Sequence, residues 1–376
     1  MKVNITMHPI FKLKSLVVLA IALFLTTTVS VAQDKENKEE KKESIFHIGF
    51  IYPVSNHGSN AGEYVNKVSF HVLGGLSAGE TGFALSGLAT VVNGNAEGAQ
   101  IAGLSNLVKG HVQGFQLAGL ANLYGSSRGG QVAGLANFAR ENVDGFQLAG
   151  LANLYGNSKG AQIAGLSNIA RQNVDGFQFA GLFNKARNVN GSQFAGLVNV
   201  AKKVRGVQFA GLINIADSSD CPIALINIIK KGEKTIGLST DETLTTLASF
   251  RSGGRVMYGI LGLGYNFKND DQVFAAEAGL GAHFFQGNKF RLNTELTSLT
   301  LTDFDSGNYF KSSLRLLPSF KLSKRIEIYA GPTLNFVNTN TEEGKKLVDH
   351  YFWSDDSSND FKGLYIGYTG GIQFIL

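Results

Sequence analysis

Two pentapeptides carry the Gly-x-Ser-x-Gly pattern of a nucleophile elbow, in which a serine on a strained turn between a strand and a helix attacks an acyl carbonyl. They are residues 125–129 (GSSRG) and 156–160 (GNSKG). Both occupy the same place in successive copies of a repeat, with strand-like sequence on either side. We therefore interpret them as turns, in which Gly permits a positive φ and Ser or Asn bonds locally.

The other residues that could carry chemistry are scattered along the chain. The histidines are His8, His47, His57, His71, His111, His283 and His350. None has the i, i+4 partner or the Cys neighbours of a helical zinc site. The single cysteine, Cys221, has no adjacent His or Lys to activate it, so an inert buried thiol is expected. One cysteine also excludes an intramolecular disulfide framework.

Two weaker candidates complete the search for a site. Gly262-Leu263-Gly264 lacks the third Gly and the helix of a dinucleotide-binding loop. Asp355, Asp356 and Asp360 could bind calcium, but an acidic, solvated loop is the favoured interpretation. The sequence therefore predicts no catalytic, cofactor-binding or metal-binding residue, no cofactor and no enzymatic activity.

Amide side chains are the one polar feature that recurs. They belong to the motif Gly-x-Gln-x-Ala-Gly-Leu-x-Asn, with Gln at 100, 116, 131, 147, 162, 178, 193 and 208 and Asn at 106, 122, 137, 153, 168, 184, 199 and 214. These amides could line a water-filled interior, or they could satisfy one another and the backbone in a crowded wall. The Ala and Leu between them make a tight surface, which favours the structural role.

The repeat has a second, longer period. Phe115, Phe146 and Phe177 follow the first Gly in alternate copies, whereas Ala99, Gly130, Ala161 and Ser192 do so in the others. The connectors alternate as well, with GSSRG and GNSKG in one class and ARENVD and ARQNVD in the other. The full unit is thus a pair of copies, as from Gln147 to Gln178, and contains two similar strands and two kinds of connector.

Each copy alternates with period two, as a β-strand does. In residues 145–155 (GFQLAGLANLY), one face is apolar and the other is small and polar, as in a transmembrane barrel strand. Two all-β architectures fit: 31-residue hairpins forming an antiparallel barrel-like sheet, or a short-coil (15–16 residue) β-solenoid followed by a small antiparallel barrel. In the solenoid, Gln would stack on Gln and Asn on Asn. We favour hairpins, because a solenoid needs no 31-residue superperiod.

The last third of the chain loses the motif and keeps the alternation. Strands are expected near 255–267, 272–286, 289–302, 309–322, 325–337 and 361–376, with an exposed loop at 338–360. Segments 45–56 and 67–75 also alternate and could pair with these strands. The ending GIQFIL resembles the terminal pattern by which outer-membrane barrels are recognised for insertion.

The first 44 residues predict export. A basic start, an apolar stretch at 15–31 and the triplet Ser30-Val31-Ala32 indicate a cleavable signal peptide over 1–32, followed by a charged linker at 33–44. The signal region contains three of the 34 Lys+Arg and no acid, so the net charge of +5 falls to +2 without it. This balance indicates no nucleic-acid partner. The remaining chain divides into a β-repeat region at 45–235 and barrel-like strands at 236–376.

The array GFQLAGLAN, GAQIAGLSN, GFQFAGLFN resembles the surface-repeat proteins of Gram-negative bacteria, over roughly residues 45–230. This resemblance implies a place at the cell surface or in the outer membrane, and it carries over no catalytic residue. We expect an exported β-repeat protein with a structural or interaction role; the alternative is an outer-membrane channel or transporter for polar solutes. A charged constriction would favour the alternative, and the sequence reveals none. Membrane lipid is the expected partner, and no particular protein or polysaccharide is indicated.

Overall fold

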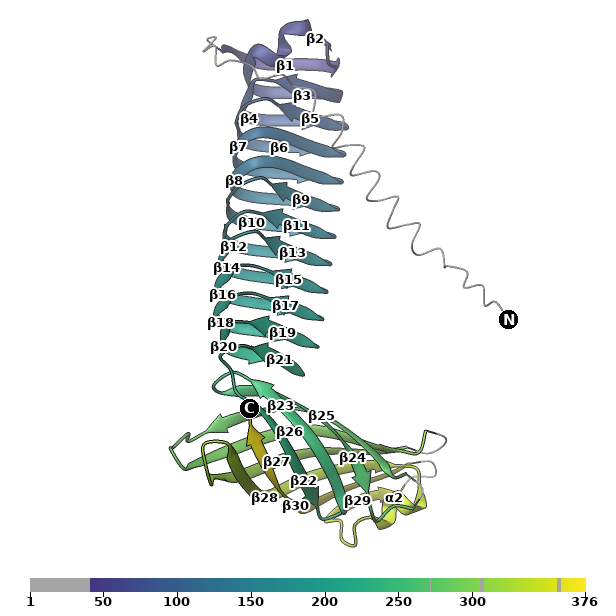
Figure 1. The fold of residues 1–376 in the computed structure, drawn as a ribbon. Helices are drawn as coiled ribbons and strands as arrows, with labels where there is room; N and C mark the ends of the chain where they lie inside the picture. The colour runs from purple at the N-terminus through teal and green to yellow at the C-terminus, as the bar shows by residue number, and fades with distance from the viewer. Residues whose placement is uncertain (1–40, 271, 305–307, 357–359) are drawn as a thin grey trace, which may run out of the picture. The chain divides into compact units, whose positions relative to one another are not determined.

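The computed structural model describes residues 41–376 except 271, 305–307 and 357–359. The expected signal peptide and most of the charged linker lie outside these residues. The fold is all-β and has two parts, a parallel β-solenoid of about 11 turns and an antiparallel barrel of eight strands (Figure 1). Each part is described by itself below.

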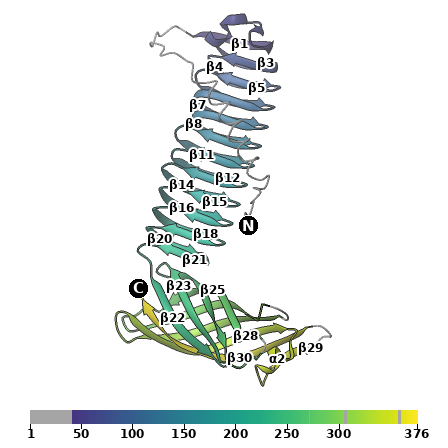
Figure 2. The same cartoon turned by 45° about the vertical axis from the view of Figure 1, so that its right-hand side comes forward.

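Each solenoid coil contains two short strands, and the strands of successive coils stack in two parallel rows (Figure 2). The first row carries the Gln positions and contains β4 (Gly79–Ser86), β6 (Ala96–Ala102), β10 (Val143–Ala149), β12 (Ser158–Ala164), β14 (Asn173–Ala180), β16 (Asn188–Ala195), β18 (Lys203–Ala210) and β20 (Ser218–Ile223). The second row carries the Asn positions and contains β5 (Ala89–Val92), β9 (Ala136–Ala139), β11 (Ala152–Tyr155), β13 (Ser167–Ala170), β15 (Phe183–Lys185), β17 (Val198–Val200), β19 (Ile213–Ala216) and β21 (Ile226–Ile229). Three longer strands contribute to both rows: β3 (Tyr64–Ser77), β7 (Ser105–Ala118) and β8 (Ala121–Ala133).

The hairpin arrangement favoured from the sequence is wrong for the repeats, and the solenoid alternative is confirmed. Neighbouring strands run parallel and in register, so that Gln147 lies opposite both Gln131 and Gln162. Identical residues face each other because each coil contains one copy of the motif and returns the chain to its starting edge. Period-two alternation is common to both strand directions and could not distinguish them.

The 31-residue superperiod has its physical cause inside the coils. The buried Tyr124 hydroxyl accepts a hydrogen bond from the Gln147 amide, whereas Ser127 donates to the Oε1 atom of Gln131 over 3.0 Å. The same two pairs recur two coils further along the chain as Tyr155–Gln178 and Ser158–Gln162. From Gln131 to Gln178, alternate Gln side chains therefore bond to a small and a large hydroxyl residue in turn, which gives this part of the solenoid a two-coil period.

A ladder of asparagines runs along the interior of the second row. Each Asn donates from Nδ2 to the Oδ1 atom of the Asn in the next coil, over 2.9–3.1 Å, in an unbroken series from Asn106 to Asn227. Asn153 also donates to the backbone carbonyl of Ile163, over 2.8 Å. All of these side chains are fully buried. The repeated asparagines thus satisfy one another and the backbone in a close-packed wall, as their Ala and Leu neighbours indicated.

A column of glycines allows the coils to approach closely at the turn between the rows. A Cβ atom placed on Gly150 would lie 2.1 Å from the carbonyl oxygen of Gly134, in the preceding coil. Equivalent contacts recur at Gly119, Gly134 and Gly165. The Gly of the Ala-Gly-Leu motif is therefore required by stacking.

The start of the described chain covers the first coil. Strand β1 (Lys42–Ile51) pairs with β2 (Val54–Ser55) and with β3, and a short 3₁₀ helix, η1 (Gly58–Glu63), leads into β3. The expectation that segments 45–56 and 67–75 pair with the C-terminal strands is therefore wrong. These segments cap the solenoid, which protects the edge that its first coil would otherwise expose.

The barrel contains the six strands expected from the sequence and two more. Its ring is β22 (Lys234–Asp241), β23 (Thr245–Gly253), β24 (Met257–Asn266), β25 (Phe274–Phe284), β26 (Phe290–Thr302), β27 (Tyr309–Lys321), β28 (Ile326–Thr339) and β30 (Phe361–Ile375). All neighbours are antiparallel, and β22 pairs with β30 to close the ring. The segment expected to be a loop, 338–360, contains a short helix, α2 (Glu342–Lys346), and strand β29 (Trp353–Asp356), which pairs with β30.

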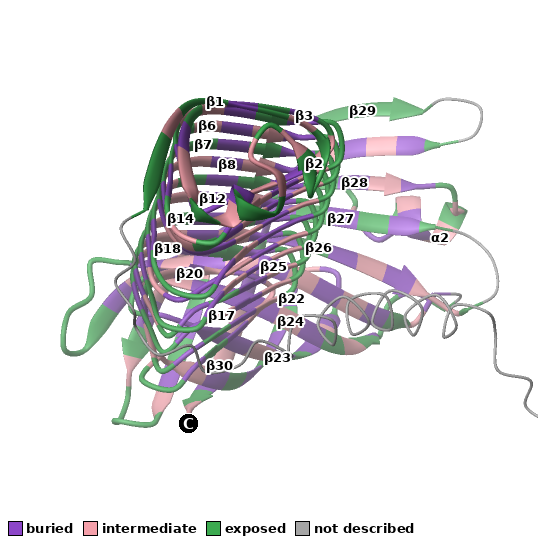
Figure 3. Cartoon of the chain, turned by 90° about the horizontal axis from the view of Figure 1, so that it is seen from above, coloured by how far each residue is buried: buried purple, intermediate pink, exposed green. Residues whose placement is uncertain are grey.

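Burial alternates along the barrel strands, as the colours in Figure 3 show for the whole chain. Large apolar side chains face outward: Leu263, Leu296 and Ile366 are 71%, 63% and 73% exposed. Polar and charged side chains face inward. Among the described residues, no helix is long and apolar enough to cross a membrane.

Gly150→Ala is expected to destabilise the solenoid, because its Cβ would clash with the Gly134 carbonyl and force adjacent coils apart. The matched control is Gly130→Ala, whose Cβ would meet only the Phe115 ring, at 3.2 Å. Overpacking costs about 1–3 kcal/mol. Faster hydrogen exchange in β9–β13 is expected for Gly150→Ala alone. Equal protection in the two variants would contradict the role given to the glycine column.

Candidate functional site

Charged side chains gather inside the barrel, where sequence reasoning predicted no site. The group comprises four cations, Arg251, Arg291, Arg315 and Lys311, and four carboxylates, Asp241, Glu277, Glu295 and Glu327. Each of these eight side chains is at most 8% exposed. They come from β22, β23 and β25–β28, and the alternation of each strand turns them inward while its apolar residues face out.

The middle cluster joins five strands, β23 to β27. Arg251 donates from Nε to Glu295 Oε1 over 2.8 Å, and the Tyr258 hydroxyl donates to the same oxygen over 3.0 Å. Arg315 pairs with Glu277 and lies 3.6 Å from the second oxygen of Glu295. Glu295 is therefore shared by two arginines, so this one carboxylate ties opposite parts of the wall together across the interior.

A second cluster is built around Arg291. Its guanidinium bonds to Glu327 through Nε over 2.8 Å and to Glu233 through Nη2 over 2.7 Å. Beside it, the Nδ1 atom of His283 lies 2.6 Å from the Asn293 side chain. The void next to this cluster is about 10 Å³, which is room for about one water molecule.

The third cluster pairs Lys311 with Asp241. The other oxygen of Asp241 accepts from the Thr243 hydroxyl over 2.7 Å and from the Thr245 backbone N–H over 3.1 Å. The carboxylate is thus held by its own turn while it faces the ammonium group. Burying a charge that has no partner costs a large free energy of desolvation. Pairing and hydrogen bonding of this kind offset that cost.

Together the three clusters place buried charges of both signs inside the barrel, and charge in the interior is the kind of feature that would favour a channel or transporter. The four cations face five carboxylates, because Glu233 also pairs with Arg291. Sequence reasoning missed them because the partners lie far apart: 44 residues separate Arg251 from Glu295, and 70 separate Lys311 from Asp241. The alternation of Arg291, Asn293 and Glu295 along the expected strand 289–302 is the signal that could have found them.

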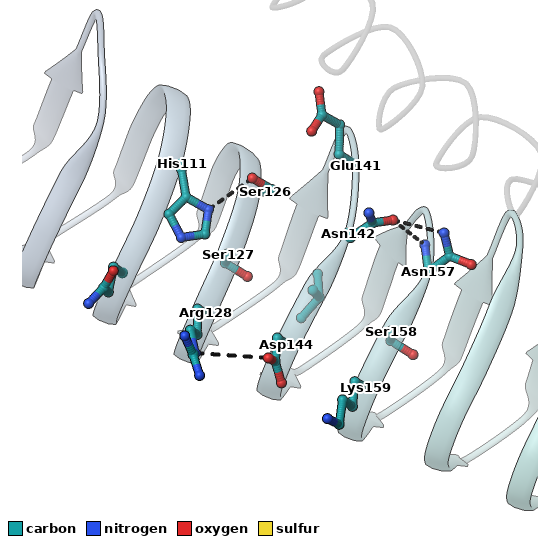
Figure 4. A pocket seen from close by; sticks show the side chains of 12 residues that line it. His111, Ser126, Ser127, Arg128, Glu141, Asn142, Asp144, Asn157, Ser158 and Lys159 are labelled. Carbon is teal, nitrogen blue, oxygen red and sulfur yellow. Dashed lines mark hydrogen bonds and ion pairs between the residues drawn. The ribbon is translucent and has the colours of Figure 1, made fainter.

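The solenoid carries a shallow, open groove of about 590 Å³ along its connectors (Figure 4). Arg128, Asp144 and Lys159 point outward side by side from successive coils, and Arg128 lies 3.9 Å from Asp144. Nearby, the Nδ1 atom of His111 lies 2.9 Å from Ser126 Oγ, and Asn157 donates to Asn142 over 2.8 Å. The groove therefore offers alternating charge of both signs on a regular spacing.

The two Gly-x-Ser-x-Gly segments have no elbow geometry. Ser127 and Ser158 are buried and point into the coil, where each donates to a Gln. Residues 125–129 lie within β8, so strand precedes and follows the serine. The interpretation of residues 125–129 as a turn is therefore wrong, although Gly129 and Gly160 do have the positive φ values, +129° and +112°, that glycine permits.

The remaining candidates stay apart from one another. Cys221 is partly exposed, which corrects the expectation of a buried thiol, and desolvation together with Asp220 raises its pKa. Asp356 pairs with Lys345 over 3.2 Å on the exposed strand β29. Gly262 and Gly264 lie inside β24. In the described part of the chain, no three His, Cys, Asp or Glu side chains are arranged to hold one metal ion.

Three histidines that the sequence left scattered meet at the cap of the solenoid. His47 on β1 is 1% exposed, and its ring centroid lies 4.4 Å from that of His71 and 4.8 Å from that of His57. The His47 Nδ1 and His71 Nε2 atoms are 3.2 Å apart. Desolvation, followed by the charges of His71 and His57, lowers the pKa of His47 to about 4. The spacing of these histidines along the chain has no regular period, which concealed the cluster in the sequence.

No family model, curated protein or solved structure matches the chain. The function must therefore be inferred from the geometry of the barrel and the solenoid.

The cap is expected to weaken as the pH falls from 6.5 to 4. In the unfolded chain His47 is protonated near pH 6.5, whereas in the folded cap it is protonated only near pH 4. The free energy that stabilises the folded cap therefore falls by up to about 3 kcal/mol. Desolvation also lowers the pKa of His71, which acts in the same direction. Desolvation raises the pKa of the neighbouring Glu80, which acts in the opposite direction.

Hydrogen exchange in β3, followed across this pH range, measures the effect. The variant His47→Gln should flatten the dependence, and Glu80→Gln should steepen it. An unchanged pH profile in His47→Gln would show that the histidine cluster does not control the cap.

Proposed function

We propose that the chain is an exported outer-membrane protein whose barrel spans the bilayer, and that the barrel acts as a narrow channel or transporter for small polar solutes. The observation that carries this proposal is the inverted distribution of polarity around a closed ring of strands. Side chains such as Leu263 and Ile366 face outward, and paired charges such as Arg251 and Glu295 face inward. A closed ring leaves no strand edge unsatisfied, which is what hydrocarbon requires of a spanning sheet.

The charged interior supports a channel over a purely structural role. An eight-stranded ring is just wide enough for its side chains to fill, so conduction requires the ion pairs to exchange partners. Glu295 already faces both Arg251 and Arg315, at 2.8 and 3.6 Å, and this shared carboxylate is where an exchange can occur. The interior therefore suits solutes that can take the place of one member of such an ion pair. Small ions are the main members of this class.

The repeat motif and the apolar stretch before Ala32 support export by the same route as the surface-repeat proteins that the array resembles. Membrane lipid is then the first partner. A structural or interaction role without conduction is the competing function. In that case the barrel is only an anchor, and its ion pairs serve to fill it.

Membrane embedding predicts that detergent, and not salt or urea, releases the protein from membranes. The folded barrel should also migrate differently from the boiled protein on mild-detergent gels, because a closed ring resists partial unfolding. Leu263→Asn and Leu263→Val are a matched pair on the outward face, and only the polar variant should reduce the yield of the heat-modifiable form. Release by urea alone would contradict a spanning barrel.

Conduction predicts small current steps when the full chain is refolded into planar lipid bilayers. Glu295→Gln leaves excess positive charge in the interior and should shift the reversal potential toward anion selectivity. Arg315→Gln removes a positive charge and should shift it toward cations. Glu141→Gln, on an exposed connector of the solenoid, is the control and should leave the reversal potential unchanged.

Heat-modifiable migration confirms that each variant has folded before its current is measured. Folded protein that passes no current above the lipid background would leave the barrel as an anchor and refute the channel. A reversal potential that is the same in Glu295→Gln, Arg315→Gln and the unmodified chain would show that the ions do not pass through the charged interior.

A further inference from the structure

The outer face of the first solenoid row is an exposed apolar surface. We call it the Gln-row face; it consists of the outward side chains of the eight coils that carry Gln100 to Gln208, numbered coils 1 to 8. Phe146 and Leu148 in coil 4 are 36% and 38% exposed, and Phe179 in coil 6 is 52% exposed. Since neighbouring strands lie about 4.8 Å apart, the eight coils extend over about 38 Å.

Large and small residues alternate along this face. Phe146 lies opposite Gly130 on one side and Ala161 on the other. The series through coils 1 to 8 is Ala99, Phe115, Gly130, Phe146, Ala161, Phe177, Ser192 and Val207. Ridges of Phe therefore stand about 9.6 Å apart with gaps between them, because each ridge is two strands from the next.

The charges beside the ridges alternate with the same period. One column of exposed charged residues runs through coils 3 to 6, with neighbours opposite one another. It consists of Arg128, Asp144, Lys159 and Asp175. The outer members of this column, in coils 1, 2, 7 and 8, are Glu97, Gln113, Asn190 and Arg205. In coils 3 to 6, acids thus accompany the Phe coils, and bases accompany the coils with small residues.

We propose that this face binds a second copy of the chain, with the two solenoids antiparallel and the two-fold axis running along the strands between coils 4 and 5. Rotation about this axis places coil 1 against the partner's coil 8, coil 2 against the partner's coil 7, and so on. The numbers of two facing coils therefore always add to nine. A Phe coil then always meets a coil with a smaller residue, and each ridge enters a gap. Such an interface is isologous, as in most homodimers.

The charged column fits the same rotation. Asp144 meets the partner's Lys159, Arg128 meets the partner's Asp175, and the end of the column places Glu97 against the partner's Arg205. Gln113 in coil 2 faces the partner's Asn190 in coil 7, so the two neutral residues of the column also meet. A parallel or one-coil-shifted arrangement would place like charges or two ridges together.

The third outward column agrees with this register. Its C-terminal half carries Phe179, Phe194 and Phe209, and its N-terminal half carries the smaller Ile101, Leu117 and Val132. The rotation brings each Phe against one of the smaller residues. The face measures about 38 by 20 Å, roughly 750 Å² on each partner, which is close to the 800 Å² typical of a specific complex.

Cysteine crosslinking of the full chain in detergent tests the direction of pairing. In a Cys221→Ser background, mixing Glu97→Cys with Arg205→Cys should give a crosslinked heterodimer with a short bismaleimide. Glu97→Cys alone should not crosslink, because its two copies lie seven coils, or about 34 Å, apart. Glu97→Cys homodimers would indicate a parallel pair and overturn the two-fold. Absence of both products would overturn the interface.

Two matched variants test the surface itself by sedimentation of the detergent-solubilised protein. Ala161→Phe fills a gap and should convert dimer to monomer, although Phe occupies the same position in coils 4 and 6. Ser167→Phe is the control: it lies on the opposite sheet, where Phe183 occupies the equivalent place in the next coil, and should leave the dimer intact.

Asp144→Lys should weaken the dimer at least tenfold, and adding Lys159→Asp should restore it, since each then meets its complement. Circular dichroism confirms that the variants retain the solenoid. Monomers at every concentration of the unmodified chain, or equal behaviour of Ala161→Phe and Ser167→Phe, would refute the proposal.

Discussion

Stacking of identical amides at the spacing of β-strands is the constraint on which the solenoid depends. Asn137, Asn153 and Asn168 can pass a hydrogen bond from coil to coil only if each coil repeats the same register. A shift of one residue would turn the buried amides outward and bring apolar side chains into the coil. The glycine at each turn serves the same requirement, because the coils approach so closely that a Cβ has no place there.

The barrel satisfies its buried polar groups by a different physical solution. The solenoid repeats one neutral side chain along its length, whereas the barrel combines unlike charges from different strands. Arg251 and Arg315 meet at Glu295 because β23, β26 and β27 bring them to one level of a closed ring. Each part also buries an apolar cluster beside its polar groups: Val112, Tyr124 and Tyr155 belong to the one in the solenoid, and Leu247, Leu299 and Leu301 to the one in the barrel.

Much of this architecture could be predicted from alternation, and some of it could not. Alternation located six barrel strands to within a few residues, from β24 to β30, because the period of a strand is independent of its partners. It said nothing of strand direction, so the parallel pairing of Gln147 with Gln162 could be given only as the alternative to hairpins. The superperiod was taken to favour hairpins, although it arises from Tyr124 and Ser127 inside the coils. Contacts between distant segments, such as His47 with His71 or Arg251 with Glu295, have no local signal.

The interior ladder places no limit on how many coils the solenoid contains. Asn153 and its counterparts make the same hydrogen bonds to the coil before and the coil after. Insertion or deletion of a single copy of the motif would therefore leave the asparagine ladder intact. The pattern of Tyr and Ser inside, and of Phe and small residues outside, has a period of two coils. A change by one coil would place equal neighbours together at the junction, whereas a change by two coils would not. Between Phe115 and Phe177, a change of length by two coils therefore preserves both alternations, whereas a change by one coil interrupts them.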